Sequence, residues 1–191
     1  MILSPQIIAA STGCTLLRAS QWLTSLQPAC DKYAINTPLR LAAFLATVGV
    51  ESGALAWTAE IWGPTAEQKA YEPPSRKASE LGNTQAGDGF RFKGRGLLQI
   101  TGRRNYLLCG IGIDLDLIAH PELLEQPEHA SMSAAWYWFN RRLNDLADDG
   151  NFLGLSRAVN LGSVASKAMP NGWTERLALY GAGKKAMGVT Q

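Results

Sequence analysis

The chain has 191 residues, with 18 basic and 16 acidic side chains and a formal net charge of +2. Hydrophobic residues make up 46% and charged residues 18%, a balance that excludes intrinsic disorder and low-complexity sequence. Because the two signs of charge nearly cancel, no broad electrostatic field indicates nucleic acid as a partner. No stretch approaches the roughly 18 to 20 apolar residues that cross a bilayer, so we expect no membrane insertion.

Cysteine and histidine are too few and too scattered to indicate a metal site. Cys14, Cys30 and Cys109 form an odd set without CxxC spacing, which predicts buried thiols rather than a disulfide framework. His120 and His129 are the only histidines. We therefore expect neither a bound metal nor a cofactor.

Two helices are predicted within residues 1–36. Ser4 and Pro5 open a short apolar segment, and residues 16–35 carry leucine, tryptophan and tyrosine at mostly helical spacing. The clearest helix follows over residues 39–52. Thr37 is a typical N-cap residue just before it, and Gly53 is placed to end it.

Glu51 lies on the apolar face of this third predicted helix. At about 100° per residue, Phe44, Val48 and Glu51 fall within about 60° of one another. Helices rarely place an acid on their buried stripe unless that acid is paired or functional. We therefore expect Glu51 to be partly buried in a cleft.

The segment from residue 57 to residue 96 is punctuated by glycine, proline, asparagine and aspartate, which predicts a long irregular or hairpin-bearing region. Loops of this length inside a compact domain are usually functional or disordered. Five aromatic residues within the segment favour an ordered loop that faces a ligand. They are Trp57, Trp62, Tyr71, Phe90 and Phe92.

Helical spacing returns after Gly110, in residues 116–125, 127–146, 152–160 and 173–186. The fold class is therefore mainly α, without an internal repeat. We expect a single domain over residues 1–191. Its parts are N-terminal helices in 1–36, a core in 37–106 and C-terminal helices in 107–191.

Glu51 and Glu60 have the chemistry of a general acid and a general base. On one continuous helix they would lie about 13 Å apart on nearly opposite faces, which prevents joint action. A turn at Ser52 and Gly53 would instead allow the separation of about 6.5 to 9.5 Å that leaves room for a water molecule in inverting glycosidases. The alternative is that Glu60 is an ordinary surface acid.

A longer motif follows these carboxylates. Residues 94–96 read Gly-Arg-Gly, residues 99–102 read Gln-Ile-Thr-Gly, and Asn105 and Tyr106 come next. This pattern closely resembles the signature of family 19 chitinases and of the related phage and prophage endolysins. The resemblance implies a two-lobed, lysozyme-like or chitinase-like helical domain with a cleft and a small irregular or hairpin segment.

The resemblance also implies roles for individual residues. Glu51 matches the general acid, Glu60 the general base, and Thr101 the hydroxyl that positions the attacking water. Arg176 matches a structural or cleft-side arginine of the family. The residues expected to bind substrate are Gln99, Asn105, Tyr106 and Asn160, together with Trp62 as a cleft-lining aromatic side chain.

Three departures from the family pattern are visible. Val50 stands where the family usually has a histidine immediately before the acid. The segment between Glu60 and Gly87 is short compared with plant chitinases. Asn160 is followed by leucine and glycine rather than by two glycines. These differences bear on the assignment of Glu60 as the base and on the choice of substrate more than on the assignment of Glu51 as the acid.

Basic residues cluster around the motif, with Phe90 and Phe92 interleaved. The cluster is too short and isolated to predict nucleic-acid binding. It would suit either an anionic wall polymer or a solvated loop with one or two structural ion pairs. Its members are Arg91, Lys93, Arg95, Arg103 and Arg104.

The leading hypothesis is an inverting glycoside hydrolase that cleaves β-1,4 bonds of bacterial peptidoglycan, as a lysozyme-like endolysin does. Chitinase activity on β-1,4-linked N-acetylglucosamine is the alternative. Another class is a cysteine peptidase or amidase that uses Cys109 with His120 or His129. The last alternative is a wall-binding module without catalysis.

These hypotheses share one partner, a peptidoglycan or chitin-like polysaccharide, and we expect a monomer. The first ten residues carry no basic leader, so a cleaved export signal is not expected. The protein would then be made in the cytoplasm and reach the cell wall after release by another factor.

Overall fold

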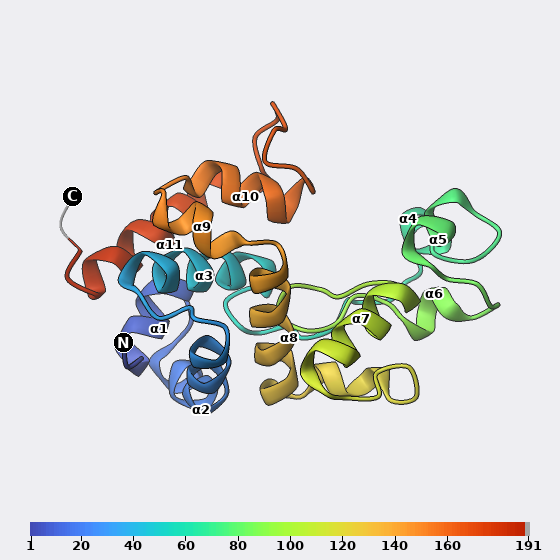
Figure 1. The fold of residues 1–191 in the computed structure, drawn as a ribbon, viewed down its shortest axis with the longest axis horizontal. Coiled ribbons are helices and arrows are strands. Elements are labelled where there is room, and N and C mark those ends of the chain that lie inside the picture. Colours follow the sequence, from blue (N-terminus) through green and yellow to red (C-terminus); the bar gives the residue numbers. More distant parts are fainter. Residues whose placement is uncertain (190–191) are drawn as a thin grey trace.

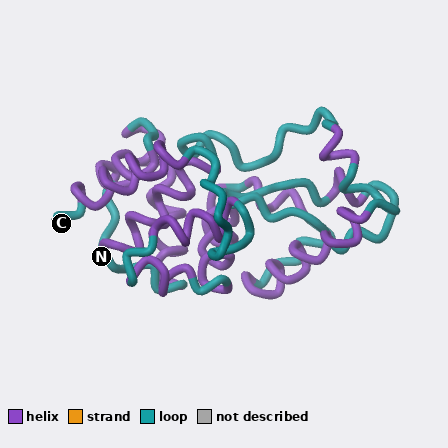
Figure 2. The backbone as a smooth tube through the Cα atoms, turned by 90° about the horizontal axis from the view of Figure 1, so that it is seen from above, coloured by secondary structure: helices purple, strands orange, loops and turns teal. Residues whose placement is uncertain are grey.

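Helices joined by loops make up the computed structural model, which describes residues 1–189 (Figures 1 and 2). No named strand occurs in these residues. The elements are α1 (Pro5–Thr12), α2 (Leu16–Lys32), α3 (Pro38–Glu51), α4 (Ala66–Lys69), α5 (Arg76–Leu81), α6 (Asp88–Arg91), α7 (Arg103–Ile113), the 3-10 helix η1 (Pro121–Glu125), α8 (Pro127–Asn140), α9 (Leu143–Asp148), α10 (Phe152–Asn160) and α11 (Trp173–Ala186). The predicted mainly α fold class is confirmed.

Two groups of helices form two lobes (Figure 1). The large lobe contains α1, α2, α3, α9, α10 and α11 and holds the larger hydrophobic core. The small lobe, residues 58–126, contains α4 to α7 and η1 and has a separate core. Helix α8 lies between them and contacts α2 and α9 on one side and α7 and η1 on the other. The predicted two-lobed arrangement therefore has α8 as its bridge.

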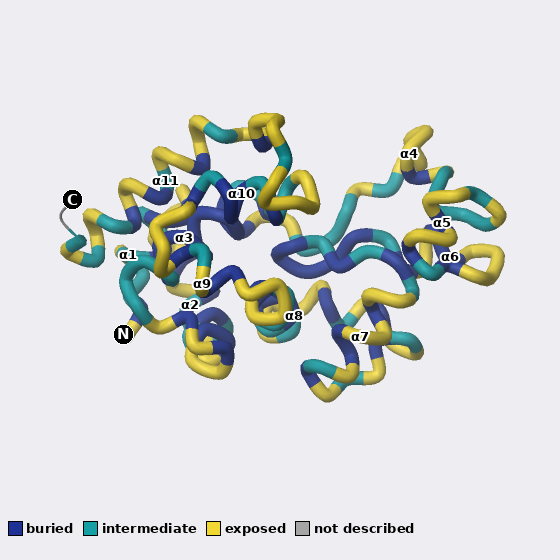
Figure 3. Tube along the Cα trace, turned by 45° about the horizontal axis from the view of Figure 1, so that its top comes forward, coloured by how far each residue is buried: buried dark blue, intermediate teal, exposed yellow. Residues whose placement is uncertain are grey.

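Helix α3 is the central element of the large lobe and is buried along most of its length (Figure 3). Its start is as predicted, because the Thr37 side chain accepts a hydrogen bond from the Arg40 N–H at 3.3 Å. Near its end, Gly49 approaches α1 so closely that a Cβ there would lie 2.7 Å from the Thr12 Cα. A glycine is therefore required at this crossing.

The chain breaks after Glu51 as predicted. Gly53, Ala54 and Leu55 all have left-handed backbone conformations, with φ of 57°, 58° and 62°. The Ser52 side chain stabilises the turn, because its hydroxyl accepts a hydrogen bond from the Leu55 N–H at 2.9 Å. Two consecutive non-glycine residues at positive φ are uncommon, which shows that the surrounding packing imposes this turn.

The segment predicted to be irregular contains three short helices, α4, α5 and α6. An isolated antiparallel bridge joins Ala59 to Arg95 within this segment, and a second joins Arg95 to Ile100 just beyond it. Backbone hydrogen bonds from Glu60 N to Gly94 O, at 2.8 Å, and from Gly96 N to Thr58 O, at 2.8 Å, join the first pair of segments. Glu60 therefore lies directly beside Gly94 of the Gly-Arg-Gly motif.

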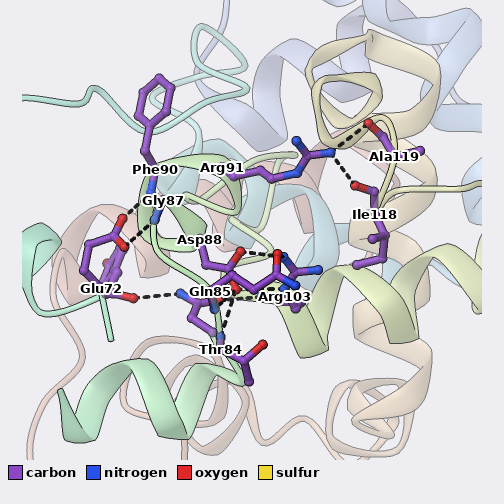
Figure 4. A network of polar contacts seen from close by, with 12 residues as sticks. Glu72, Thr84, Gln85, Gly87, Asp88, Phe90, Arg91, Arg103, Ile118 and Ala119 are labelled. Atoms are coloured by element: carbon purple, nitrogen blue, oxygen red, sulfur yellow. Dashed lines mark hydrogen bonds and ion pairs between the residues drawn. The ribbon is translucent and has the colours of Figure 1, made fainter. Parts of the chain in front are cut away.

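A polar network centred on Asp88 holds the outer part of the small lobe together (Figure 4). The Asp88 carboxylate accepts hydrogen bonds from the Thr84 N–H at 2.8 Å and the Gln85 N–H at 3.0 Å. Arg103 donates to both carboxylate oxygens, at 2.8 and 2.6 Å. Asp88 is 2% exposed, so these bonds replace its contacts with water.

Three features of the C-terminal half differ from the prediction. Residues 116–125 contain only η1, because the segment before Pro121 forms turns rather than an α-helix. The helix predicted over 127–146 is split into α8 and α9, where Arg142 has a left-handed φ of 55°. Helix α7 was not predicted. Helices α10 and α11 have the predicted bounds.

Within residues 1–189, no helix has both the length and the apolar character needed to cross a membrane.

Candidate active site

A cavity of about 350 Å³ opens where the two lobes meet. It receives residues from the end of α3, the motif segment, α8 and α10. The lining residues are Glu51, Leu81, Leu98, Gln99, Ile100, Thr101, Asn105, Trp136, Tyr137, Asn140, Arg141, Val159 and Asn160. Five residues selected from the sequence, Glu51, Gln99, Thr101, Asn105 and Asn160, are thus brought together.

Glu51 projects into this cavity from the last turn of α3, and its side chain is 23% exposed. The predicted partial burial is confirmed. Its Oε1 forms an ion pair with the Arg176 Nη2 from α11. Arg176 is 1% exposed and also donates from Nε to the Asn171 carbonyl at 2.9 Å. The arginine that resembles a family residue therefore orients the candidate acid.

Tyr137 lies beside the candidate acid. Burial raises the pKa of the Tyr137 hydroxyl, the positive charge of Arg141 lowers it, and the negative charge of Glu51 raises it. Glu51, Tyr137 and Arg141 all line the same cavity.

Glu60 is held by two hydrogen bonds to its two carboxylate oxygens. Gln68 Nε2 donates to Oε1 at 2.9 Å, and the Gly94 N–H donates to Oε2 at 3.0 Å. Gln68 is itself buried and caps α4 through its side chain. This arrangement fixes the orientation of the Glu60 carboxylate, as a residue that must direct a water molecule requires.

Gly94 is the point where three candidate residues converge. A Cβ on Gly94 would lie 2.5 Å from Gln99 Oε1, 3.3 Å from Glu60 Oε2 and 3.3 Å from Thr101 Oγ1. The side-chain oxygens of Glu60, Gln99 and Thr101 therefore surround the same point. Gln99 and Thr101 line the cavity, whereas Glu60 lies behind them, next to Gly94, and does not line it.

Hydrogen bonds within the motif orient these polar side chains. Gln99 has a positive φ of 52°, and its Nε2 donates to the Gly96 carbonyl at 3.0 Å. The Thr101 hydroxyl donates to the Gln99 carbonyl at 3.0 Å. Because the hydroxyl proton is used in this bond, the lone pairs of Thr101 remain available to accept from a water molecule.

Two further amides complete the cavity. Asn105 Nδ2 donates to the Thr101 carbonyl at 2.7 Å, which leaves its side-chain oxygen available as an acceptor. Asn160 Oδ1 accepts from the Asn171 N–H at 2.8 Å, which leaves its side-chain NH₂ available as a donor. Donors and acceptors of this kind suit the hydroxyl and N-acetyl groups of a sugar.

Two residues predicted to bind substrate lie elsewhere. Tyr106 is fully buried, and its hydroxyl donates to the Lys93 carbonyl at 2.6 Å and accepts from Arg95 Nη1 at 3.0 Å. It therefore belongs to the core of the small lobe. Trp62 packs against Tyr71 and Phe90, with ring centroids 6.2 and 5.5 Å away, and does not line the cavity.

Sequence reasoning missed the contribution of α8. Trp136, Tyr137, Asn140 and Arg141 all line the cavity. The helical spacing of Tyr137, Asn140 and Arg141, at positions i, i+3 and i+4, could have indicated one shared face. The aromatic residues of this helix are also typical of core packing, and Trp138 is in fact fully buried.

The structure argues against a cysteine nucleophile. Cys109 is fully buried in the small-lobe core, where burial raises the pKa of its thiol to about 12. A thiol with this pKa holds almost no thiolate at neutral pH. Among residues 1–189, moreover, no three His, Cys, Asp or Glu side chains are grouped to hold a metal ion.

The basic cluster has structural partners. Arg95 is 7% exposed and pairs with Glu125, with Nε and Oε1 2.6 Å apart. Arg103 pairs with Asp88, as described above. Arg91 donates to the carbonyls of Ile118 and Ala119 at 2.8 and 3.1 Å (Figure 4). These contacts favour the interpretation of the cluster as structural ion pairs and loop anchors.

A first prediction concerns Gly94. The change Gly94→Ala would place a methyl group against the flexible end of Gln99, so the fold should tolerate it while the amide leaves its position. We expect kcat/KM to fall by about tenfold or more, since small displacements of positioning groups are costly. The thermal midpoint should change little.

The control for this prediction is Gly181→Ala, because nothing lies within 4 Å of a Cβ at that exposed position on α11. Activity measured with a soluble chitin oligomer should be unchanged in this control. Full activity of Gly94→Ala would show that the close approach of Glu60, Gln99 and Thr101 at Gly94 is not needed for catalysis.

Known proteins are similar in sequence to part of this chain. Endochitinase 2 of Gossypium hirsutum is 36% identical over 104 residues, which make up 51% of this chain and 34% of the cotton protein. A glycosyl hydrolase family 19 domain-containing protein of Haemophilus influenzae is 33% identical over 105 residues, which make up 54% of this chain and 47% of that protein. The chain thus matches a third to a half of the length of these relatives.

Solved structures share the whole fold. A bacterial family 19 chitinase superposes with a TM-score of 0.71 and 23% identity, covering 99% of this chain and 96% of the other. A class IV chitinase from Zea mays superposes with a TM-score of 0.65 and 26% identity, covering 90% of this chain and 81% of the other. The family model described as chitinase class I matches residues 14–149. The chain therefore belongs to glycoside hydrolase family 19.

Proposed function

We propose that the protein hydrolyses β-1,4 glycosidic bonds in a polysaccharide that contains N-acetylglucosamine. The observation that carries this proposal is the cavity between the lobes, where the half-buried Glu51 lines the same space as Gln99 and Thr101, whose side-chain oxygens lie around Gly94 together with the carboxylate of Glu60. Family membership supports the same reaction class. Several similar proteins are named endochitinases, which makes chitin-type chains the first candidate substrate.

In the proposed reaction Glu51 is the general acid. It protonates the leaving glycosidic oxygen as the bond to the anomeric carbon breaks. Arg176 holds the Glu51 carboxyl toward the cavity. The acid role requires a proton on Glu51 when the sugar is bound, so substrate must exclude water from the cavity or move the carboxyl away from Arg176.

Glu60 is the proposed general base. Its carboxylate accepts a proton from a water molecule that attacks the anomeric carbon on the face opposite the leaving group, which inverts the anomeric configuration. Thr101 would accept a second hydrogen bond from this water, since its hydroxyl proton points to the Gln99 carbonyl. Gln68 and the Gly94 N–H keep the base in place.

The experiment is a digestion of a chitin hexamer with wild type and Glu60→Gln, followed by ¹H NMR of the first products. We expect wild type to release the α-anomer from the β-linked substrate. Glu60→Gln should lower kcat by about 100-fold, the lower part of the range for a general base. Release of the β-anomer would contradict the two-carboxylate inverting mechanism, and products without new reducing ends would exclude a glycosidase.

Peptidoglycan is the second candidate substrate. It shares N-acetylglucosamine with chitin but alternates this sugar with one that carries a lactyl ether and a peptide, so it bears carboxylates that chitin lacks. The observation that favours it is the charge of the cavity wall at Arg141.

A further inference from the structure

Arg141 differs from every other arginine in the described part of the chain. Its guanidinium has no hydrogen bond or ion pair with residues 1–189, although it lines the candidate active-site cavity. All other arginine side chains donate to a carboxylate or carbonyl of the protein: Arg18, Arg40, Arg76, Arg91, Arg95, Arg103, Arg104, Arg142, Arg157 and Arg176.

The Arg141 guanidinium lies against the aromatic ring of Tyr137. Arg141 is the C-terminal cap residue of α8, and its guanidinium carbon lies 4.7 Å from the centre of the Tyr137 ring. Stacking on an aromatic face orients a guanidinium and leaves its N–H edge directed outward. Since Tyr137 and Asn140 line the same cavity, this edge borders the space where substrate would bind.

Arg141 has no carboxylate partner among the described residues. Of residues 1–189, Glu51 and Arg141 are the charged ones that line the cavity, and Glu51 already pairs with Arg176. The Glu60 carboxylate, which lies near Gly94 beyond this lining, is bonded to Gln68 and the Gly94 N–H instead of to Arg141. The exposed Arg141 guanidinium is therefore free to bind an anionic ligand. A planar guanidinium with free donors matches a carboxylate in two-point geometry, and such charge-assisted bonds are about twice as strong as neutral ones.

We propose that Arg141 binds a carboxylate of the substrate and thereby selects an acidic, N-acetylated polysaccharide of the peptidoglycan type over neutral chitin. This inference rests on the proposed glycosidase function and specifies its substrate class. The carboxylate could belong to the lactyl group of the acidic sugar or to the peptide attached to it. Both sources present the same chemistry to Arg141.

The test compares four substrates that differ in charge. They are a chitin hexamer, peptidoglycan with its peptides, peptide-free glycan strands with free lactyl carboxylates, and the same strands after conversion of the carboxylates to amides. The variants are Arg141→Gln, Arg141→Lys and the control Arg142→Gln. Arg142 is exposed and paired with Asp145, and it does not line the cavity.

We expect Arg141→Gln to lower kcat/KM on the carboxylated substrates by about 10- to 100-fold, the range for one lost charge-assisted hydrogen-bonded pair. The loss on the amidated strands and on chitin should be at least several-fold smaller, because these substrates present no carboxylate to Arg141. Arg141→Lys should recover part of the loss, because it restores the charge without the planar fork. Arg142→Gln should match wild type on all four substrates.

The substrates also identify the source of the carboxylate. If Arg141→Gln lowers kcat/KM on the peptide-free strands, the lactyl group supplies the carboxylate. If it lowers kcat/KM only on intact peptidoglycan, the peptide supplies it. Equal losses on charged and neutral substrates would overturn the inference, because Arg141 would then act through the fold or through an uncharged contact. An unchanged kcat/KM on every substrate would overturn it as well.

A binding experiment separates this inference from the glycosidase proposal. If wild type hydrolyses none of the substrates, the proposed function fails. Calorimetric titration of Glu51→Gln with carboxylated and amidated strands then still tests Arg141. Tighter binding of the carboxylated strands that disappears in Glu51→Gln/Arg141→Gln supports the inference, and equal binding of both strands refutes it.

Discussion

Glu51→Gln should lower kcat by about 1,000-fold on oligosaccharide substrates, within the range attributed to a general acid. Glutamine has nearly the same shape and keeps an oxygen that can accept from Arg176, but it has no proton to give to the leaving oxygen. The fold should therefore persist, and KM should change little. Steady-state kinetics with a chitin oligomer, together with the thermal midpoint, check this expectation.

The leaving group provides a test that is specific to acid catalysis. An aryl glycoside with a good leaving group needs little protonation, so Glu51→Gln should lose far less activity on it than on an oligosaccharide. Glu60→Gln should lose similar activity on both substrates, because the base acts on the attacking water. Equal losses for Glu51→Gln on the two substrates would show that Glu51 positions substrate instead of protonating it.

Asp88→Asn should lower the free energy of unfolding by about 3 kcal/mol at pH 7, the cost of breaking a buried charge pair. Asp88 is 2% exposed and bonded to Arg103 at two points. For a chain of this size the loss corresponds to a drop of about 10 °C in the thermal midpoint. Asp145→Asn, which removes an exposed pair with Arg142, should have little effect.

The contribution of Asp88 depends on pH in a defined direction. Burial raises the pKa of the Asp88 carboxyl, but hydrogen bonds from Arg103, Gln85 and Thr84 outweigh it and lower the pKa below the ordinary 3.8. The folded state therefore gains stability from ionised Asp88 above about pH 4, and loses it as pH falls through the lower folded-state pKa.

Urea unfolding of wild type and Asp88→Asn across this pH range tests the linkage. The difference in the free energy of unfolding between the two proteins should be largest near neutral pH and shrink in acid. A difference that is constant from neutral to acidic pH would mean that Asp88 acts through packing and not through its charge.

Local signals explain why α3 and its acid could be predicted. The Thr37 cap and the left-handed Gly53 act on neighbouring backbone groups, so short-range preferences decide where the helix begins and ends. The position of Glu51 at the end of a buried stripe then follows from helical periodicity. The same reasoning located α10 and α11, whose predicted bounds match those observed.

Contacts between distant segments explain what could not be predicted. Arg142 adopts a left-handed conformation with no glycine to indicate it, so α8 and α9 looked like one helix. Tyr106 belongs to a recognisable motif, yet its hydroxyl is used by Arg95 and Lys93 inside the small-lobe core. Trp62 likewise packs on Tyr71 and Phe90, and not on the cavity.

Helix caps, periodicity and motif spacing are local signals, so they are enough to predict a mainly helical chain with a candidate acid at the end of α3 and a motif that supplies Gln99, Thr101 and Asn105. The position of Glu60 beside that motif at Gly94 depends instead on contacts between segments that are distant in the chain. The same holds for Arg141, which lines the cavity without a hydrogen-bond partner among residues 1–189, because packing across the chain determines which polar groups meet.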